Sequence, residues 1–302
     1  MSDDLAVRAR LRAALAQTTR RLGEAGVPSP SVDARALIAA AARSERPLVL
    51  LETLPESFGA ELEEFTVRRE RREPLQLILG RAPFRRLMLT VRPGVFIPRP
   101  ETELAVDLLR EHLRGPLELV ADLCSGTGAL GAAVLDEIPA ARVLAVEVEP
   151  AAAALSAENL EAAGPGRGSV VRADLTGPVP QLAAAAPIDA ILSNPPYIPP
   201  DAVPRDAEVL DHDPHRALFG GGADGLGVPR AVIAWAVHLL RPGGVLVMEH
   251  ADVQGAAARA AAADSGGFDL IRTAPDLTGR DRFLVARRAD GAPSPGSERL
   301  TR

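Results

Sequence analysis

From about residue 117 to residue 288, short apolar segments alternate with segments of helical character. The apolar segments are rich in Val, Leu and Ile and lie at 117–123, 142–148, 169–175, 188–196, 243–250 and 282–288. The helical segments include 150–164, which a glycine closes, and 229–241, which begins at a proline suited to a first helical turn. Apolar strands that alternate with helices predict an α/β fold, a mainly parallel sheet with helices on both faces.

The amino-terminal part follows a different pattern and carries no strand signal. Leu11, Leu15 and Leu22 recur at helical spacing, and Ser31 is the expected cap of a second helix. A third helical segment has an apolar stripe opposite a run of glutamates. A small all-helical domain is therefore expected. Two interpretations of it stay open, a purely structural bundle and a docking module for a macromolecular substrate.

A stretch rich in Pro and Arg separates these two regions. Alternating apolar residues from Leu87 to Val91 predict a short strand, and Pro93-Gly94 signals a turn, as in a hairpin linker. The last residues are rich in Gly, Pro and Ser and are expected to be disordered. The predicted order is a helical bundle at 1–73, a hairpin linker at 74–105, the sheet domain at 106–288 and the tail at 289–302.

Composition argues against several classes of function. The 302 residues carry a formal net charge of −6, whereas proteins that neutralise duplex phosphates usually have the opposite balance, so no stable nucleic-acid binding is expected. Cys124 is the single cysteine, which excludes an intrachain disulfide and a cysteine-based zinc site. There is no secretory signal pattern, and no apolar run approaches the roughly 20 residues that span a bilayer. We expect a soluble, cytoplasmic protein without a membrane partner.

A glycine-rich turn follows the first strand expected in the sheet domain. Glycines let backbone amides approach a ligand closely, and ligands of such sheets bind at the carboxyl ends of strands. Glu147 ends the next strand, roughly 20 residues on, where a carboxylate can accept both hydroxyls of a ribose. The cofactor-binding residues predicted from this pattern are Asp122, Cys124, Ser125, Gly126, Thr127, Gly128 and Glu147.

The turn alone fits two cofactors. Gly126, Gly128 and Gly131 spell GxGxxG, so a dinucleotide-binding domain and an S-adenosylmethionine-binding domain both stay open at this point. Asp122 favours S-adenosylmethionine, because its carboxylate would attract the cationic methionine part and repel a pyrophosphate. We interpret Cys124 as a small turn residue, since a nucleophilic role would need a nearby base.

A second motif, Asn194-Pro195-Pro196-Tyr197, follows another apolar strand at its carboxyl end. An amide nitrogen is a poor nucleophile, but the Asn194 side-chain oxygen and the Pro195 carbonyl can accept both of its N–H hydrogens. That arrangement favours the positive charge that develops during methyl transfer. Consecutive prolines fix the backbone, and the Tyr197 ring can stack on a planar acceptor. We predict Asn194, Pro195 and Tyr197 as catalytic residues that hold a planar amide or amine, with Pro196 completing the substrate contact.

Two other interpretations are weaker. The tetrad alone is also typical of a turn that ends a strand, yet its place relative to the glycine turn and Glu147 favours the functional reading. His212 and His215 form an HxxH pattern in a loop, which is weak evidence for a metal site. The chemistry proposed here needs no metal, so none is expected.

With these residues in place, the chain resembles the release-factor glutamine N5-methyltransferases, the PrmC/HemK family. The resemblance spans nearly the whole chain, through EPLQLILG, VFIPRPETE, DLCSGTGAL, SNPPYIP, ALFGGGADGL and DLTGRDR. The tetrad alone is shared with adenine and cytosine amino-methyltransferases of DNA and RNA. VFIPRPETE together with an amino-terminal bundle points to this family, and it implies a class I, Rossmann-like methyltransferase fold.

The resemblance also implies a substrate and further site residues. The acceptor would be the glutamine of the Gly-Gly-Gln loop in class I peptide chain release factors, and the product S-adenosyl-L-homocysteine. Asp174 and Leu175 would lie near the adenine, Asn194 would contact the cofactor as well, and Phe96 and Arg99 would line the crevice from the linker side. Alternatives are an amino-methyltransferase of adenine in DNA or RNA, a nicotinamide-dependent oxidoreductase, and a binding module without turnover.

Overall fold

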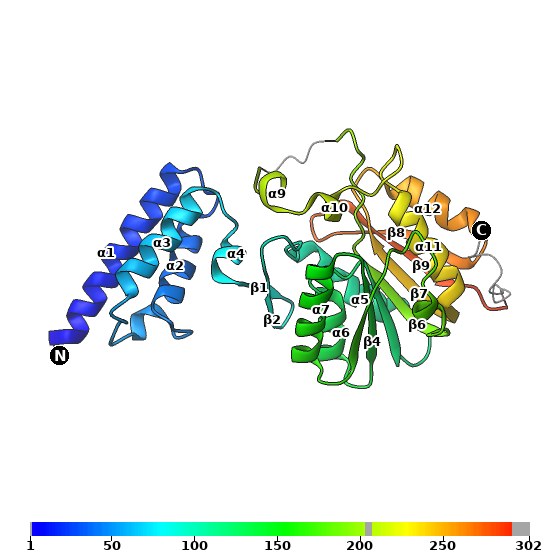
Figure 1. The fold of residues 1–302 in the computed structure, drawn as a ribbon, viewed down its shortest axis with the longest axis horizontal. Coiled ribbons are helices and arrows are strands. Elements are labelled where there is room, and N and C mark those ends of the chain that lie inside the picture. Colours follow the sequence, from blue (N-terminus) through cyan, green and yellow to red (C-terminus); the bar gives the residue numbers. More distant parts are fainter. Residues whose placement is uncertain (1, 203–206, 292–302) are drawn as a thin grey trace. The chain divides into compact units, whose positions relative to one another are not determined.

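The structure, a computed structural model, describes residues 2–202 and 207–291. The chain divides into two compact units (Figure 1). The first holds the chain up to Arg81 together with helix α9 (Ala207–His212), and the second holds the remainder. From residue 292 on, the tail that we expect to be disordered lies outside the described residues. No helix in the described ranges is both long and apolar enough to cross a membrane.

The first unit is a helical bundle, as its leucine spacing predicts. Its helices are α1 (Ser2–Glu24), α2 (Pro30–Ala41), the 3₁₀ turn η1 (Leu48–Leu50), α3 (Phe58–Glu70) and α4 (Leu75–Leu79). Leu22, Leu37 and Phe58 are fully buried between them. The expected cap, Ser31, was wrong by two positions, because α2 begins at Pro30 and Ser29 takes the cap position. A proline fits the first helical turn, where an N–H would lack a partner, so Ser31 lies inside the helix.

A buried arginine joins three helices of this unit. Arg69 of α3 donates to Asp33 of α2 at 2.7 Å, and both side chains are almost fully buried. It also donates to Glu208 of α9 at 3.0 Å, and Arg72 reaches the same carboxylate oxygen at 2.9 Å. These ion pairs explain why α9, far along the chain, groups with the amino-terminal helices.

The second unit is built on a seven-stranded sheet with the order β5-β4-β3-β6-β7-β9-β8. Its strands are β3 (Leu119–Leu123), β4 (Arg142–Glu147), β5 (Gly168–Arg172), β6 (Ile188–Ser193), β7 (Leu240–Glu249), β8 (Phe268–Pro275) and β9 (Asp281–Arg288). The first five strands in this order pair in parallel, whereas β9 is antiparallel to β7 and β8 to β9. The mainly parallel sheet predicted from the sequence is confirmed. Sequence reasoning missed β8, an edge strand whose residues are mostly only half-buried.

Helices cover both faces of this sheet (Figure 1). The helical segments of this unit are the 3₁₀ turn η2 (Pro100–Glu103), α5 (Leu104–His112), α6 (Ala129–Glu137), α7 (Pro150–Ala163), α8 (Pro180–Ala183), α10 (His215–Leu218), α11 (Gly227–Leu239) and α12 (Gly255–Asp264). One apolar core joins α5, α6 and α7 to the sheet, and a second core joins α8, α11 and α12 to its opposite face. Trp235 of α11 is buried in the second core. Crossover helices on both faces leave the carboxyl ends of the parallel strands at one edge, where loops can build a site.

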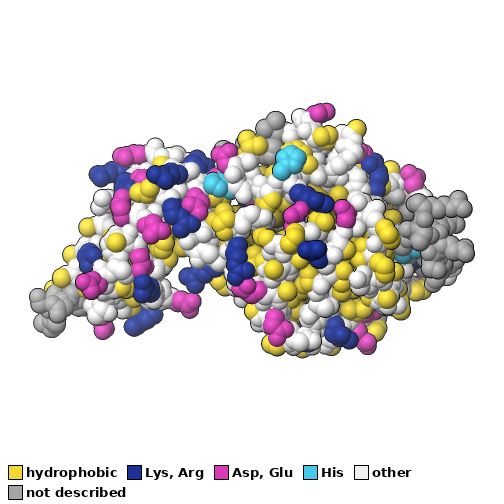
Figure 2. Space-filling view, viewed as in Figure 1, with side chains coloured by type: hydrophobic (Ala, Val, Ile, Leu, Met, Phe, Trp, Pro, Cys, Tyr) yellow, Lys and Arg dark blue, Asp and Glu magenta, His cyan; other side chains and the backbone are white. Residues whose placement is uncertain are grey.

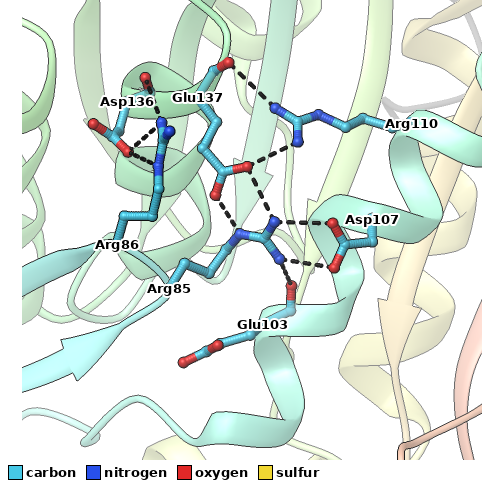
Figure 3. A network of polar contacts seen from close by, with 7 residues as sticks. All are labelled: Arg85, Arg86, Glu103, Asp107, Arg110, Asp136 and Glu137. Carbon is cyan, nitrogen blue, oxygen red and sulfur yellow. Dashed lines mark hydrogen bonds and ion pairs between the residues drawn. The ribbon is translucent and has the colours of Figure 1, made fainter.

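A short hairpin precedes this sheet. It consists of β1 (Arg81–Phe84) and β2 (Leu87–Thr90), so its own turn falls at Arg85-Arg86. The turn expected at Pro93-Gly94 is present as well, after β2, where the Val95 N–H donates to the Arg92 carbonyl at 3.3 Å. Figure 3 shows the Arg85 guanidinium between the carboxylates of Asp107 on α5 and Glu137 on α6. Arg85 also donates to the Glu103 carbonyl at 2.8 Å. Three acceptor groups, from η2, α5 and α6, thus fix the turn of the hairpin to the sheet domain.

Candidate active site

A cavity of about 490 Å³ opens where the parallel strands end. It is lined by residues that follow β3, β4, β5 and β6, as expected for ligands of open α/β sheets. Most of the predicted site residues line it, namely Phe96, Asp122, Cys124, Ser125, Gly126, Thr127, Glu147, Asp174, Leu175, Asn194, Pro195, Pro196 and Tyr197. Gly128 and Arg99 are not among its lining residues.

The glycines of the turn between β3 and α6 have different structural reasons. Gly126 has φ 54° and open space where a Cβ would stand, so its backbone borders the cavity directly. Gly128 has φ 77°, and a Cβ there would come within 2.7 Å of the Ser156 hydroxyl. A Cβ on Gly131 would come within 2.8 Å of Leu160, so this glycine allows close packing of α6 on α7. Of these three glycines, only Gly126 therefore borders the cavity.

Glu147 at the end of β4 is tied to this turn. One carboxylate oxygen accepts the Gly126 N–H at 2.8 Å, and the other accepts the N–H groups of Val148 and Glu149 at 2.8 and 2.9 Å. The side chain is 9% exposed and lines the cavity. Three of about four lone-pair sites are therefore engaged, which leaves about one for a further hydrogen bond in this arrangement.

Asp122 at the end of β3 is buried and only half satisfied. Its Oδ2 accepts the Gly131 N–H at 2.9 Å, whereas Oδ1 has no hydrogen-bond partner among the described residues. Burial raises the pKa of Asp122 to about 7, and the nearby charge of Glu147 adds to the rise. A buried carboxylate with an unpartnered oxygen at a cavity wall fits a cationic ligand group, as the sequence argument expects.

The loop after β5 carries a more exposed carboxylate. Asp174 accepts the Thr176 hydroxyl at 2.6 Å and its N–H at 2.9 Å, and these bonds hold the pKa of Asp174 below its usual value. Arg216 of α10 approaches Asp174 at 3.3 Å and Glu149 at 3.4 Å. The Leu175 carbonyl accepts the buried indole N–H of Trp235 at 2.9 Å. Both predicted residues therefore stand in a fixed loop at the cavity wall.

The tetrad at the end of β6 is held by side chains that sequence reasoning missed. Asn194 Nδ2 donates to the Thr102 hydroxyl oxygen at 3.2 Å, and the Tyr197 hydroxyl donates to Glu249 Oε1 at 3.2 Å. The Tyr197 carbonyl accepts Gln254 Nε2 at 2.8 Å, so ring and backbone are both fixed. Burial and the neighbouring Glu249 carboxylate raise the pKa of Tyr197 well above its ordinary value, so it remains a neutral hydroxyl.

Thr102 and Glu249 form the link between these two residues. Thr102 lies in η2 and donates to Glu249 Oε2 at 2.6 Å, and both side chains are buried. Burial raises the pKa of Glu249, while the Thr102 and Tyr197 hydroxyls and the charge of Arg282 oppose the rise. Glu249 ends β7 at the same edge of the sheet, a position that could have singled it out from sequence. A further missed residue, Asn159, donates to the Thr90 and Thr127 carbonyls and so joins the hairpin to the glycine turn.

The remaining predicted residues have structural partners. Arg99 pairs with Asp213, and its guanidinium carbon lies 5.0 Å from the centre of the Phe96 ring, which itself lines the cavity. Burial raises the pKa of the Cys124 thiol, which disfavours the thiolate that a nucleophile needs. In the described ranges, no three His, Cys, Asp or Glu side chains gather in a way that could hold a metal ion.

Comparison with known proteins gives relatives over nearly the full length. A family model described as the PrmC N-terminal domain matches residues 13–80, and one described as the Methyltransferase small domain matches residues 86–210. The release factor glutamine methyltransferase of Streptomyces coelicolor is 43% identical, and the alignment covers 92% of this chain and 98% of that protein. That of Bifidobacterium longum is 41% identical, with 89% and 97% covered. A solved methyltransferase of Pyrococcus furiosus has the same fold, with TM-score 0.50, 18% identity, and 67% of this chain and 89% of that chain covered.

Proposed function

The chain belongs to the release factor glutamine methyltransferase family, and from this premise we propose that its acceptor is the glutamine of the Gly-Gly-Gln motif in class I release factors. It is an S-adenosylmethionine-dependent enzyme that methylates a release-factor glutamine, and N5 of the side chain is the nitrogen that receives the methyl group. The second product is S-adenosylhomocysteine. The reaction supports translation termination, and we place it in the cytoplasm, where termination occurs.

The orientation of Asn194 is the observation that carries this proposal. Its Nδ2 donates to Thr102, so Oδ1 is the atom that remains to accept a hydrogen bond in the cavity. In the proposed complex Oδ1 accepts one N–H of the glutamine amide and the Pro195 carbonyl accepts the other. Two acceptors hold the nitrogen in place and favour the positive charge that develops on it. The Tyr197 ring packs beside the planar amide.

The proposed cofactor residues would each hold a different part of S-adenosylmethionine. S-adenosylmethionine supplies an electrophilic methyl group. Asp122 would hold its cationic methionine part, since Oδ1 is buried and has no partner among the described residues. Glu147 would accept a ribose hydroxyl with the lone pair that its three backbone bonds leave, and Asp174 and Leu175 would border the adenine. Positioning of the two reactants supplies most of the rate, so no general base is required.

Two other functions that the sequence motifs allow, a nicotinamide-dependent oxidoreductase and an adenine methyltransferase, receive less support. A nicotinamide cofactor would bring its pyrophosphate toward the Asp122 carboxylate, which would repel it. An adenine methyltransferase of DNA or RNA needs a basic surface for its substrate. On the face shown in Figure 2, Arg side chains are interspersed with Asp and Glu over the described residues. Neither alternative accounts for the match to the PrmC N-terminal domain at residues 13–80.

The proposal is tested by offering the enzyme three acceptors with radiolabelled S-adenosylmethionine. A purified class I release factor, duplex DNA and transfer RNA are incubated separately, and label in macromolecule is counted. We expect label in the release factor alone. Label in either nucleic acid, with none in the release factor, would overturn the proposed acceptor. Calorimetry with S-adenosylmethionine and with NAD separates the two cofactors, and we expect heat of binding only with the first.

A further inference from the structure

Four side chains from three separate segments form one hydrogen-bonded path beside the acceptor site. Asn194 and Tyr197 follow β6, Thr102 lies in η2, and Glu249 ends β7. The path runs from Asn194 Nδ2 to Thr102 Oγ1 at 3.2 Å and from Thr102 Oγ1 to Glu249 Oε2 at 2.6 Å. It continues to the Tyr197 hydroxyl, 3.2 Å from Glu249 Oε1. Thr102 and Glu249 are 4% and 3% exposed, so the middle of the path is buried.

The polarity of this path follows from the number of hydrogens available. The charge of Arg282 and the two hydroxyls favour the ionised form of Glu249, and a carboxylate only accepts hydrogen bonds, so Thr102 gives its one hydroxyl hydrogen to Glu249. The Thr102 oxygen then offers Asn194 lone pairs alone, and only the NH₂ side of the carboxamide can face it. Oδ1 of Asn194 is turned away from Thr102 as a result. Within the described part of the chain, no donor is bonded to that oxygen.

We propose that Thr102 and Glu249 are positioning residues that fix which end of the Asn194 carboxamide faces the acceptor nitrogen. The inference rests on the proposed function, since it takes Asn194 as the residue that accepts the glutamine N–H. An inverted carboxamide would present its NH₂ group to the N–H of the substrate and would lose the acceptor. Glu249 also anchors the Tyr197 hydroxyl, so one carboxylate sets the orientation of both acceptor-site side chains.

Thr102→Val tests the relay, because valine keeps the shape of threonine and removes its hydroxyl. We expect kcat to fall by about tenfold to a thousandfold, where the upper value corresponds to complete loss of one charge-stabilising contact. The affinity for S-adenosylmethionine should not change. Thr102→Ser is the matched control. It restores the hydroxyl, and we expect it to keep most of the activity. Equal turnover of Thr102→Val and wild type would refute the relay.

A double-mutant cycle separates positioning from a general structural effect. If Thr102 acts through Asn194, Thr102→Val should cause no further loss in an Asn194→Ala background. Losses that multiply in the double variant would mean that Thr102 contributes independently of Asn194, and the inference would then be wrong. Thermal melting and calorimetry with S-adenosylmethionine check that each variant is folded.

Glu249→Gln is the second variant, and it matters if Thr102→Val does not fold. When its carbonyl accepts the Tyr197 hydroxyl, its NH₂ group faces Thr102, which must then turn its hydrogen toward Asn194 and invert the carboxamide. We expect a loss of kcat similar to that of Thr102→Val, and wild-type turnover would contradict the inference. A wild-type enzyme that methylates no release factor would instead contradict the proposed function, so the two failures are distinguishable.

Discussion

Asp122 is a residue whose ionisation is strongly set by the fold. Burial raises the pKa of Asp122 to about 7, against 3.8 for an aspartate in water, and only one of its oxygens has a hydrogen-bond donor to oppose the rise. The folded protein therefore holds this proton more tightly than the unfolded chain does. As the pH rises from about 4 to about 7, ionisation of Asp122 progressively lowers the free energy of unfolding. A bound cation would offset that cost.

The raised pKa of Asp122 should make cofactor binding depend on pH. The ionised carboxylate attracts the cationic methionine part and the neutral acid does not, so affinity should rise with pH through 7. Between pH 6 and pH 8 the ionised fraction changes roughly tenfold, which predicts a dissociation constant about tenfold lower at pH 8. Calorimetry at pH 6, 7 and 8 measures this, with Asp122→Asn as the control that should bind weakly at every pH. A flat profile for the wild type would remove Asp122 from the cofactor site.

Asn194 is the residue on which the chemistry depends most directly. Asn194→Ala removes one of two proposed acceptors and should reduce turnover by about a hundred- to thousandfold, with the cofactor pocket nearly intact. Asn194→Asp still accepts a hydrogen bond, although its added charge has a desolvation cost. We expect the Asp variant to keep more activity than the Ala variant, with a stronger dependence on pH. Near-wild-type turnover of both folded variants would mean that Asn194 only ends a strand.

At the scale of elements, the ion pair between Arg69 and Asp33 holds α2 against α3. The guanidinium and carboxylate are 5% and 9% exposed and 2.7 Å apart. Arg69→Met would leave a buried carboxylate without its partner, which typically costs about 3–5 kcal/mol. Urea unfolding of the full chain should show this loss in the transition of the helical unit. Arg43→Met is the control, because Arg43 pairs with Glu61 at the surface and its loss should hardly change the transition. A similar shift in both variants would contradict the account.

Elements with a strong local sequence pattern could be predicted. Elements whose position depends on contacts with distant residues could not. The parallel strands β3, β4, β6 and β7 are mostly buried and have apolar sequences, and the half-buried edge strand β5 still carries a β-branched pair at its centre. The edge strand β8 is half-buried and lacks that pattern, so it was missed. The hairpin turn falls at Arg85-Arg86, which has no turn signal of its own and is held by carboxylates of α5 and α6 (Figure 3).

The same distinction applies to the site. Asn194, Glu147 and Asp122 could be found because each stands at the end of an apolar strand, a place that the sequence reveals. Thr102 was missed because its importance comes from Asn194 and Glu249, which are 92 and 147 residues away along the chain. No local pattern encodes contacts of that kind.

At the scale of the whole molecule, the proposed cofactor site and the helical bundle are assigned to different units of the chain. Every proposed cofactor residue belongs to the second unit, whereas the match to the PrmC N-terminal domain covers residues 13–80. We propose that the helical unit docks the release factor. Deleting residues 1–73 should spare S-adenosylmethionine binding and raise the Michaelis constant for the release factor.

A short peptide with the Gly-Gly-Gln sequence is the control for this deletion. It is too small to need the helical unit, so the full and truncated enzymes should methylate it equally. Wild-type kinetics of the folded, truncated enzyme on the whole release factor would show that the helical unit has no docking role.

The most direct test of the central claim is to identify the atom that receives the methyl group. A class I release factor is treated with enzyme and isotopically labelled S-adenosylmethionine and mapped by tandem mass spectrometry, beside a variant whose Gly-Gly-Gln glutamine is replaced by alanine. We predict a single labelled methyl group on the side-chain nitrogen of that glutamine, and none on the variant. A methyl group on another residue, or equal labelling of the variant, would contradict the assignment.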